Sequence, residues 1–431
     1  MTRRTAVAAA AAAAVVTGAS GKPVLLGGAP VRTAAFPSWP VWGSSDETAL
    51  LQVLRSGKWF RGYGKVVDAF EGKFAAAMGS PYCLAVANGT SALMTALHGL
   101  DVQPGDEVIV PPYTFIATVN AVLSKAALPV FVDTDLRTFQ MDATKVEAAI
   151  TERTVAIVPA YIAGAPANLD KLLEISKRRK VKLLEDAAQA HLGEWRGKKL
   201  GTLGDAGTFS FQASKNLNAG EGGAVLSADR AFIERCHAYH TNSSPKRGTQ
   251  PPANQGANLR LTEFQAALLL SQMERLETQA KTRDMNAAHL TKLLQEIPGI
   301  TPVSLEEGCT RSAWHLYMFR YDAAEFAGLP REKFLKALAA EGVPCSSGYG
   351  PLNRQPFLET VLQGRGYQRL FSADRLRRWR EQNHTPVNER VCAEGVWFTQ
   401  TTLLAGREDM EQIAAAIGKI RAHAAELARL G

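Results

Sequence analysis

The chain has 431 residues, of which 46% are hydrophobic and 21% are charged, and its formal net charge is +8. These proportions are typical of a folded globular protein and exclude a disordered or fibrous chain, and the length favours two domains over one. The charge is mild, and no basic stripe with interleaved aromatic residues indicates nucleic-acid binding.

Residues 1–21 have the features of an export signal. Arg3 and Arg4 precede an apolar run from Ala6 to Val16, and small residues follow that run. Paired arginines before a short apolar run are typical of twin-arginine export, and the run is too short for a stable membrane span. We therefore expect an exported, periplasmic protein. A wrongly assigned start codon or a disordered tail are the alternatives.

The same region offers a second interpretation. Residues 15–21 resemble the first glycine turn of a nicotinamide-dependent dehydrogenase. That site needs a strand, three spaced glycines and a helix. An alanine run is a poor strand, and Pro23 stands where the helix would begin. The dehydrogenase interpretation is therefore weak.

After an irregular arm and helices over residues 46–54 and 66–78, short apolar strands alternate with helices. Strands are predicted over residues 83–86, 107–110, 129–132, 156–159, 181–184, 207–211 and 223–227, with helices over 88–100, 115–125 and 169–177. This alternation predicts an α/β fold whose mostly parallel sheet is flanked by helices on both faces. Ligands of such sheets bind beyond the carboxyl ends of the strands.

The C-terminal part has a mixed pattern. A long helix is predicted over residues 262–281, a strand near 315–321, and helices over 331–341 and 407–427. We expect a large domain over residues 22–290, including the arm, and a smaller C-terminal α+β domain over 291–431. The basic run from Arg365 to Arg380 is interpreted as a solvated helix face.

Lys215 is the first candidate catalytic residue. It lies in a polar turn between two predicted strands, with Ser210 five residues before it and a Gly-Glu-Gly-Gly turn after it. A lysine that forms a Schiff base needs a pocket that lowers its pKa, so that the free amine is available. Taken alone, the pattern fits a solvated surface lysine equally well.

Asp186 ends an apolar strand and is followed by small residues. A pyridoxal phosphate (PLP) enzyme needs a carboxylate against the pyridine nitrogen, and Asp186 is placed to provide it. Ala188 would let a flat ring lie close, and Gln189 could donate to its hydroxyl. An aspartate that caps the next helix is the alternative.

Two further turns complete a possible cofactor site. Thr90 and Ser91 follow a strand at the start of a helix, where backbone N–H groups and the helix dipole favour a phosphate. Phe115 follows another strand, where an aromatic ring could stack on a planar cofactor, although such rings are more often part of the core. Each turn alone is a weak signal.

Together these motifs resemble one family, the DegT/StrS sugar aminotransferases of fold-type I PLP enzymes. Several ordered motifs are far more specific than any one of them. The resemblance covers roughly residues 24–425, and its motifs are WFRGYGKVVDAFE, NGTSALMTAL, PPYTFIAT, FVDTD, EDAAQA, GTFSFQASKNLNAGEGGA and GANLRLTEFQAAL, in that order.

The resemblance implies a role for each candidate residue. Lys215 would carry the Schiff base and move the proton, and Asp186 would face the pyridine nitrogen. The remaining cofactor contacts would come from Gln189 on the ring hydroxyl, Phe115 and Ala188 on the two ring faces, Thr90, Ser91 and Ser210 on the phosphate, and Asn258 on the phosphate of the partner subunit. The last contact implies a homodimer with shared sites. No metal site is expected, because the five cysteines form no CxxC pair or Cys/His cluster.

The resemblance also implies the reaction. Glutamate or glutamine would give its amino group to a keto-sugar or a cyclitol ketone by ping-pong kinetics. The segments around Gly348-Tyr349 and Val396 to Gly406 resemble the inosose aminotransferase and aminohydroxybenzoate synthase branch. Tyr161 and Ala163 stand where many members carry a His and a Tyr, which leaves the acceptor open. A non-catalytic regulatory relative remains the main alternative.

Overall fold

The computed structural model describes residues 21–244 and 255–430 and is built around a seven-stranded sheet. Six strands run parallel, whereas β9 is antiparallel to its neighbours β1 and β8. In spatial order the strands are β1 (Tyr82–Val86), β9 (Gly223–Ser227), β8 (Ala206–Ser210), β5 (Lys182–Asp186), β4 (Thr154–Ile157), β2 (Glu107–Val110) and β3 (Leu128–Phe131). The predicted mostly parallel α/β sheet is therefore confirmed.

Side chains that alternate along a strand enter two separate cores, one on each face of the sheet. In β2, Ile109 packs into one buried cluster, whereas Val108 and Val110 pack into the cluster on the opposite face. This is the period of two that a pleated strand imposes. Because both faces are buried, these strands read as continuous apolar runs rather than as alternating ones.

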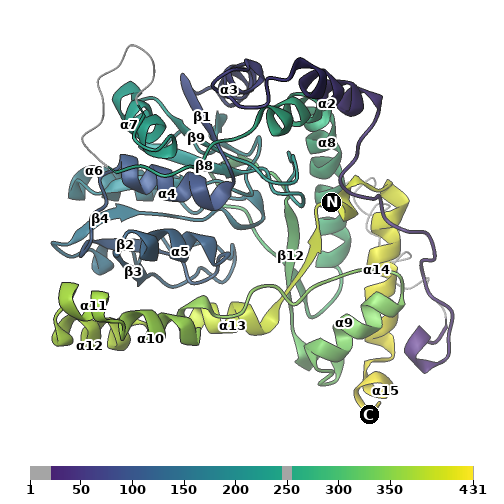
Figure 1. Cartoon of the computed structure of the whole chain (residues 1–431). Coiled ribbons are helices and arrows are strands. Elements are labelled where there is room, and N and C mark those ends of the chain that lie inside the picture. The colour runs from purple at the N-terminus through teal and green to yellow at the C-terminus, as the bar shows by residue number, and fades with distance from the viewer. Residues whose placement is uncertain (1–20, 245–254, 431) are drawn as a thin grey trace.

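Helices cover both faces of this sheet (Figure 1). On one face lie α3 (Val66–Met78), α6 (Leu169–Arg179) and the first half of α8 (Glu263–Gln295). On the other lie α4 (Gly89–Gly99), α5 (Ala117–Ser124) and α7 (Arg230–His240). The helix α2 (Ser44–Ser56) packs along α8.

A second core forms around a three-stranded antiparallel sheet, β10–β12–β13. Its strands are β10 (Ile300–Pro302), β12 (Leu316–Tyr321) and β13 (Gly395–Thr399), and it packs with α9 (Arg331–Ala340), α14 (Arg407–Ala422) and α15 (Ala424–Ala428). The helix α8 is longer than the predicted 262–281 and runs into this core, which Leu290, Leu293 and Leu294 enter. The predicted domain boundary at residue 290 therefore falls inside one continuous helix.

The segment between these elements returns to the large sheet. The helices α10 (Pro356–Leu362), α11 (Arg365–Leu370) and α12 (Ala373–Gln382) bury Tyr367, Phe371 and Trp379 in the same core as α4 and α5, and α13 (Pro386–Glu394) leads back to β13. Figure 1 shows this row of helices below β2, β3 and α5. This part of the predicted small domain therefore packs on the large sheet, although it follows the second core in the sequence.

The prediction that Arg365–Arg380 forms a solvated face is wrong for one residue. Arg375 forms an ion pair with Glu107, whose side chain is completely buried at the start of β2. Burial of a charge requires such a partner. The other arginines of this run that form ion pairs, Arg377 and Arg380, do so at the surface.

The smaller elements complete the chain. They are η1 (Val24–Leu26), η2 (Glu147–Ala149), η3 (Ile162–Gly164), η4 (Ala323–Phe326), η5 (Leu352–Arg354), η6 (Thr402–Leu404), and the strands β6 (Glu194–Trp195), β7 (Lys198–Lys199) and β11 (Cys309–Arg311) of a third sheet.

The predicted export signal lies outside the described residues, apart from Gly21. In the part of the chain that the structure describes, no helix is long and apolar enough to cross a membrane.

Candidate active site

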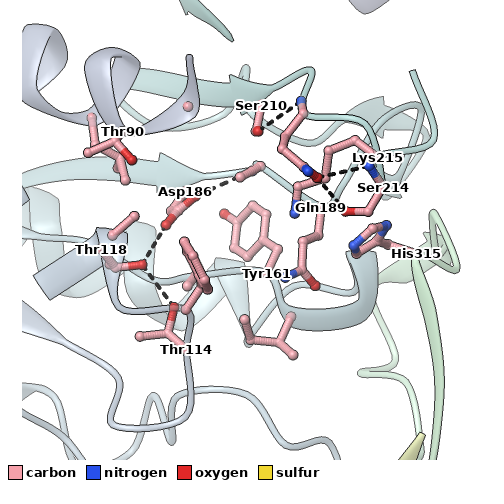
Figure 2. Close-up of a pocket in the computed structure, with 18 of the residues that line it drawn as sticks. Thr90, Thr114, Thr118, Tyr161, Asp186, Gln189, Ser210, Ser214, Lys215 and His315 are labelled. Carbon is pink, nitrogen blue, oxygen red and sulfur yellow. Dashed lines mark hydrogen bonds between the residues drawn. The ribbon is translucent and has the colours of Figure 1, made fainter. Parts of the chain in front are cut away.

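A cavity of about 820 Å³ lies at the carboxyl ends of the parallel strands. Residues that follow β1, β2, β4, β5 and β8 line it, as the strand order predicts. The opposite wall comes from the start of β12, from β13 and from the segment before η5. Figure 2 shows Thr90, Thr114, Thr118 and Asp186 on one side of the cavity and Ser214, Lys215, Gln189 and His315 on the other.

Lys215 lies in the connection between β8 and β9 and lines the cavity. Its backbone N–H donates to the Gln212 carbonyl at 2.8 Å, and the N–H of Ala213 donates to the Gly220 carbonyl at 2.9 Å. These bonds fix the turn on both sides of the lysine. Desolvation lowers the pKa of Lys215 to about 8, although the charge of Asp186 opposes this effect. About a tenth of the amine is therefore uncharged at neutral pH, a far larger fraction than for an ordinary lysine.

Asp186 is buried at the carboxyl end of β5 and faces the same cavity. Thr118 Oγ1 donates to Asp186 Oδ2 at 2.8 Å, and Thr114 Oγ1 lies 2.8 Å from Thr118 Oγ1. The Ala188 N–H donates to Oδ1 at 3.3 Å. Burial raises the pKa of Asp186, whereas these hydrogen bonds and Lys215 lower it. A cationic group placed in the cavity would favour the ionised form further.

The neighbouring Glu185 has a different role. Its carboxylate accepts the backbone N–H groups of Gly201, Leu203 and Gly204 at 2.6–2.7 Å. The Tyr161 hydroxyl also donates to it, at 2.9 Å. Tyr161 lines the cavity, yet its hydroxyl is committed to this buried carboxylate. The ring of Tyr161 is therefore a fixed wall rather than a proton donor to a ligand.

Thr90, Ser91 and Ser210 lie at one end of the cavity, beside the N-terminus of α4. Asn88 caps this helix by accepting the Ser91 N–H at 2.8 Å. A Cβ on Gly89 would come within 2.6 Å of the Ser210 Cβ, so only glycine permits β8 and α4 to approach this closely. Hydroxyls and the N-terminal N–H groups of α4 thus converge where an anion is favoured.

Gln189, Ala188 and Phe115 also line the cavity, as predicted. Gln189 Oε1 accepts the Ala163 N–H at 2.8 Å, and its Nε2 donates to the Tyr349 hydroxyl at 3.2 Å. One N–H of this amide remains for a ligand. Phe115 is 56% exposed, which leaves its ring free to cover a flat ligand.

The C-terminal part of the chain contributes four cavity residues that were not predicted as site residues: His315, Leu316, Tyr349 and Trp397. Leu316 and Trp397 lie on β12 and β13, His315 directly precedes β12, and Tyr349 lies in the segment before η5. Tyr349 packs edge-on against Trp397, with ring centroids 4.8 Å apart, and against Tyr113 at 5.5 Å. The Gly348-Tyr349 pattern pointed to this segment, but no pattern in the sequence indicated that the segment closes the cavity.

Asn258 does not line the cavity of its own chain. It is exposed and forms an isolated antiparallel bridge with Thr241. The predicted contact with a partner subunit remains a prediction. The other predicted site residues are Lys215, Asp186, Thr90, Ser91, Phe115, Ala188, Gln189 and Ser210, and all of them line one cavity.

These residues fit PLP. The cavity brings together an amine of lowered pKa, a buried carboxylate, a cluster of hydroxyls at a helix N-terminus and a small residue, Ala188, where a flat ring could rest. A metal centre finds no comparable support, since the described residues contain no group of three or more His, Cys, Asp or Glu side chains that could hold an ion.

Comparison with known proteins agrees with this geometry. Residues 42–417 match the model of the DegT/DnrJ/EryC1/StrS aminotransferase family. The crystal structure of 3-amino-5-hydroxybenzoic acid synthase is similar to this chain, with a TM-score of 0.80 and 34% identity over 91% of this chain and 99% of that one.

Two similar proteins come from Streptoalloteichus tenebrarius. One is L-glutamine:2-deoxy-scyllo-inosose aminotransferase, 36% identical over 93% of this chain and 97% of the relative. The other is provisionally assigned as L-glutamine:3-amino-2,3-dideoxy-scyllo-inosose aminotransferase and is 38% identical over 92% of this chain and 97% of the relative.

Proposed function

Since this chain belongs to the DegT/DnrJ/EryC1/StrS aminotransferase family, we propose that it transfers the α-amino group of glutamine to the ketone carbon of a cyclic polyol, with PLP as its cofactor. The observation that carries this proposal is that Lys215, Asp186 and the N-terminus of α4 all face one cavity. Those are the groups that a PLP-dependent transaminase needs.

Each residue has a defined task in this reaction. When bound, PLP supplies a ring that accepts the electrons left behind when the substrate carbon loses its proton. Asp186 would hold a proton on the ring nitrogen, because its carboxylate is buried and fixed by Thr118. Lys215 Nζ would take the α-proton of the donor and deliver it to the carbon on the other side of the amino nitrogen, two bonds away. The acceptor ketone then passes through the same steps in reverse order, so ping-pong kinetics are expected.

The cavity favours an uncharged ring as the acceptor. Among the described residues that line it, Lys215 is the only lysine or arginine, and Tyr161, Tyr349 and Trp397 supply aromatic walls. A nucleotide-linked sugar carries phosphates, which are usually recognised by arginine or lysine. The two inososes named for two relatives are hydroxylated ring ketones without phosphate, and one of them also carries an amino group. This agreement supports a cyclitol over a nucleotide-linked keto-sugar.

We also propose a homodimer in which Asn258 reaches the partner's phosphate site. In support, Trp59 and Tyr63 form an exposed aromatic surface, 51% and 76% exposed, and Trp59 packs on Phe264 at the start of α8. Exposed aromatic patches of this kind often mark protein interfaces. Export through the twin-arginine route likewise stays a proposal that rests on residues 1–21 alone.

The two alternatives find less support. A regulatory relative with a damaged site would have lost cofactor residues, whereas Lys215, Asp186 and Gln189 all remain in the cavity. A dehydrogenase would need a strand and a helix around Pro23, but Val24–Leu26 forms a single 3₁₀ turn.

Isotope labelling tests the proposed function. The protein is incubated with 2-deoxy-scyllo-inosose and with glutamine labelled with ¹⁵N at either the α-amino or the amide position. The proposal predicts that only the α-label appears in the aminated ring, as measured by mass spectrometry. Transfer of the amide label, or no product from any polyhydroxylated ring ketone, would contradict it.

A further inference from the structure

Among the described residues that line the cavity, His315 is the only histidine. It lies just before β12 and is only 6% exposed. Its backbone N–H donates to the Ala163 carbonyl at 2.8 Å, and the N–H of Ala313 donates to the Gly164 carbonyl at 3.0 Å. The backbone of His315 is thus fixed to η3, which follows β4 of the large sheet. Figure 2 shows its side chain on the same side of the cavity as Lys215.

The hydrogen bonds around His315 select one tautomer of its ring. Asn216 Nδ2 donates to the Ala313 carbonyl at 2.7 Å, which turns the Asn216 Oδ1 toward His315. His315 Nδ1 lies 3.2 Å from that oxygen. Since the oxygen can only accept, Nδ1 must carry the hydrogen and Nε2 must carry the lone pair.

The remaining nitrogen of the ring is available to a ligand. His315 Nε2 makes no hydrogen bond with any residue that the structure describes. Burial lowers the pKa of His315 well below its ordinary value, and the nearby charges of Lys215, His191 and Arg283 act in the same direction. The ring is therefore neutral, and Nε2 is a hydrogen-bond acceptor on the cavity wall beside Lys215.

Three cavity groups that could accept a hydrogen bond from a polyol are already engaged within the protein. The Tyr161 hydroxyl is committed to Glu185, and Gln189 Oε1 is committed to Ala163. Gln212 Oε1 accepts from the backbone N–H and the hydroxyl of Ser214. The hydroxyls of a cyclic polyol lose their hydrogen bonds to water when the ring enters the cavity. Each hydroxyl must then donate to an acceptor in the cavity, or binding is weakened.

We propose that His315 binds the acceptor ring directly: its Nε2 accepts a hydrogen bond from the hydroxyl next to the ketone carbon, and this contact decides which ring carbon lies beside Lys215. Asn216 is then a positioning residue, because it acts only by fixing the tautomer of His315. The inference rests on the proposed function and deepens it. A ring with similar hydroxyls at several carbons could bind in several rotated positions, and a specific contact is needed to select the one that places the ketone carbon beside Lys215.

Separate half-reactions test this role. One sample of the protein is loaded with PLP and mixed with glutamine, and another is loaded with pyridoxamine phosphate and mixed with 2-deoxy-scyllo-inosose. In the His315→Phe variant, the rate constant of the ketone half-reaction should fall at least about tenfold more than that of the glutamine half-reaction. The His315→Gln variant keeps an accepting oxygen and should recover part of the loss.

Two controls exclude a purely structural effect. His191→Phe changes another buried histidine near Lys215 that does not line the cavity, so it should affect both half-reactions equally. A ketone analogue that lacks the hydroxyl next to the carbonyl should react with the wild type and with His315→Phe at similar rates. Thermal unfolding and cofactor absorbance establish that each variant is folded and loaded.

The Asn216→Asp variant tests the tautomer. A carboxylate beside Nδ1–H would raise the pKa of His315, so the ring would carry a proton at neutral pH and Nε2 would become a donor. The ketone half-reaction of this variant should therefore be slow at low pH and recover as the pH rises, whereas the wild type should show no such titration.

The outcomes are distinct. A selective loss in the ketone half-reaction that disappears with the analogue supports the role of His315. Equal losses in both half-reactions, or a loss that persists with the analogue, overturn the inference alone. If the wild type loaded with pyridoxamine phosphate converts no polyhydroxylated ring ketone, the proposed function fails and the inference fails with it.

Discussion

Two adjacent buried carboxylates, Glu185 and Asp186, show how a strand assigns different roles to neighbouring residues. Successive side chains of β5 point to opposite sides of the sheet. Glu185 accepts three backbone N–H groups of the turn before β8 and the Tyr161 hydroxyl, so it has no capacity left for a ligand. Asp186 is held by Thr118 and faces the cavity. Only Asp186 is therefore free to pair with a cationic ring.

The hydroxyl of Thr118 should strengthen cofactor binding through Asp186. In Thr118→Val the donor to Asp186 Oδ2 is lost at nearly constant volume, which raises the pKa of Asp186 further and weakens its charge against the ring nitrogen. A lost hydrogen bond to a charged group costs about 1.5–3 kcal/mol, so the Kd for PLP should rise roughly 10- to 150-fold. Titration of the apoprotein with PLP, followed by fluorescence quenching, measures this change.

Thr114→Val is the matched control for this prediction. Thr114 contacts Asp186 only through Thr118, so its loss should raise the Kd much less. Equal Kd values for Thr118→Val and Thr114→Val would contradict a direct role of Thr118.

The residues after strands were predictable, and those on the second core were not. Lys215, Asp186 and Thr90 follow strands of a parallel sheet, and the carboxyl ends of such strands share one edge. His315 and Tyr349 reach the cavity only because the second core packs over that edge. Nothing local in the sequence around them encodes this contact, which depends on how two cores pack together.

At the scale of elements, the buried ion pair between Glu341 and Lys419 helps to hold the N-terminal arm. Glu341, with a completely buried side chain, accepts the Val24 and Val31 N–H groups at 2.9 Å each and contacts Lys419 Nζ at 3.0 Å. Lys419 also donates to the Ala29 carbonyl at 2.6 Å. The arm is therefore part of the second core rather than a loose extension.

Replacing Glu341 should loosen the arm around Val24 and Val31. In Glu341→Gln the Lys419 charge stays buried without its anionic partner, and breaking a buried pair in this way costs about 3–5 kcal/mol. Urea unfolding should show this loss, and hydrogen exchange should show faster exchange at Val24 and Val31. The matched surface change Arg178→Ala removes the exposed pair with Glu147 and should cost at most about 1 kcal/mol. Similar losses in both variants would contradict the role of the buried pair.

The helices differed in how well the sequence predicted them. The range 66–78 was predicted to the residue because Val67, Phe70 and Phe74 mark one helical face. The run Arg365–Arg380 was predicted as one solvated helix face, but it forms parts of two helices, α11 and α12, because α12 begins anew after its cap at Ser372. The helix α10 was not predicted. The continuation of α8 past Lys281 was also missed, since its two halves face different cores.

At the scale of the whole molecule, the proposed dimer makes each site depend on two chains. Lys215 would come from one subunit and Asn258 from the other. Mixing Lys215→Ala with Asn258→Ala subunits should therefore restore activity, because each mixed dimer has one intact site. Complete exchange of equal amounts should give about a quarter of the wild-type activity.

Subunits are exchanged by brief denaturation and refolding. The transfer of the glutamine α-amino group to the ring ketone then measures this recovery. Unmixed samples of either variant, treated identically, are the controls. An Asn258→Ala variant that is fully active alone, or a mixture that stays inactive although mixed dimers form, would contradict shared sites.

The central claim is that Lys215 anchors PLP in this cavity. The most direct test is reduction of the protein with borohydride after incubation with PLP, followed by peptide mapping with mass spectrometry. We predict a phosphopyridoxyl adduct on Lys215, and none in the Lys215→Ala variant. An adduct on another lysine, or no adduct in the wild type, would contradict the account.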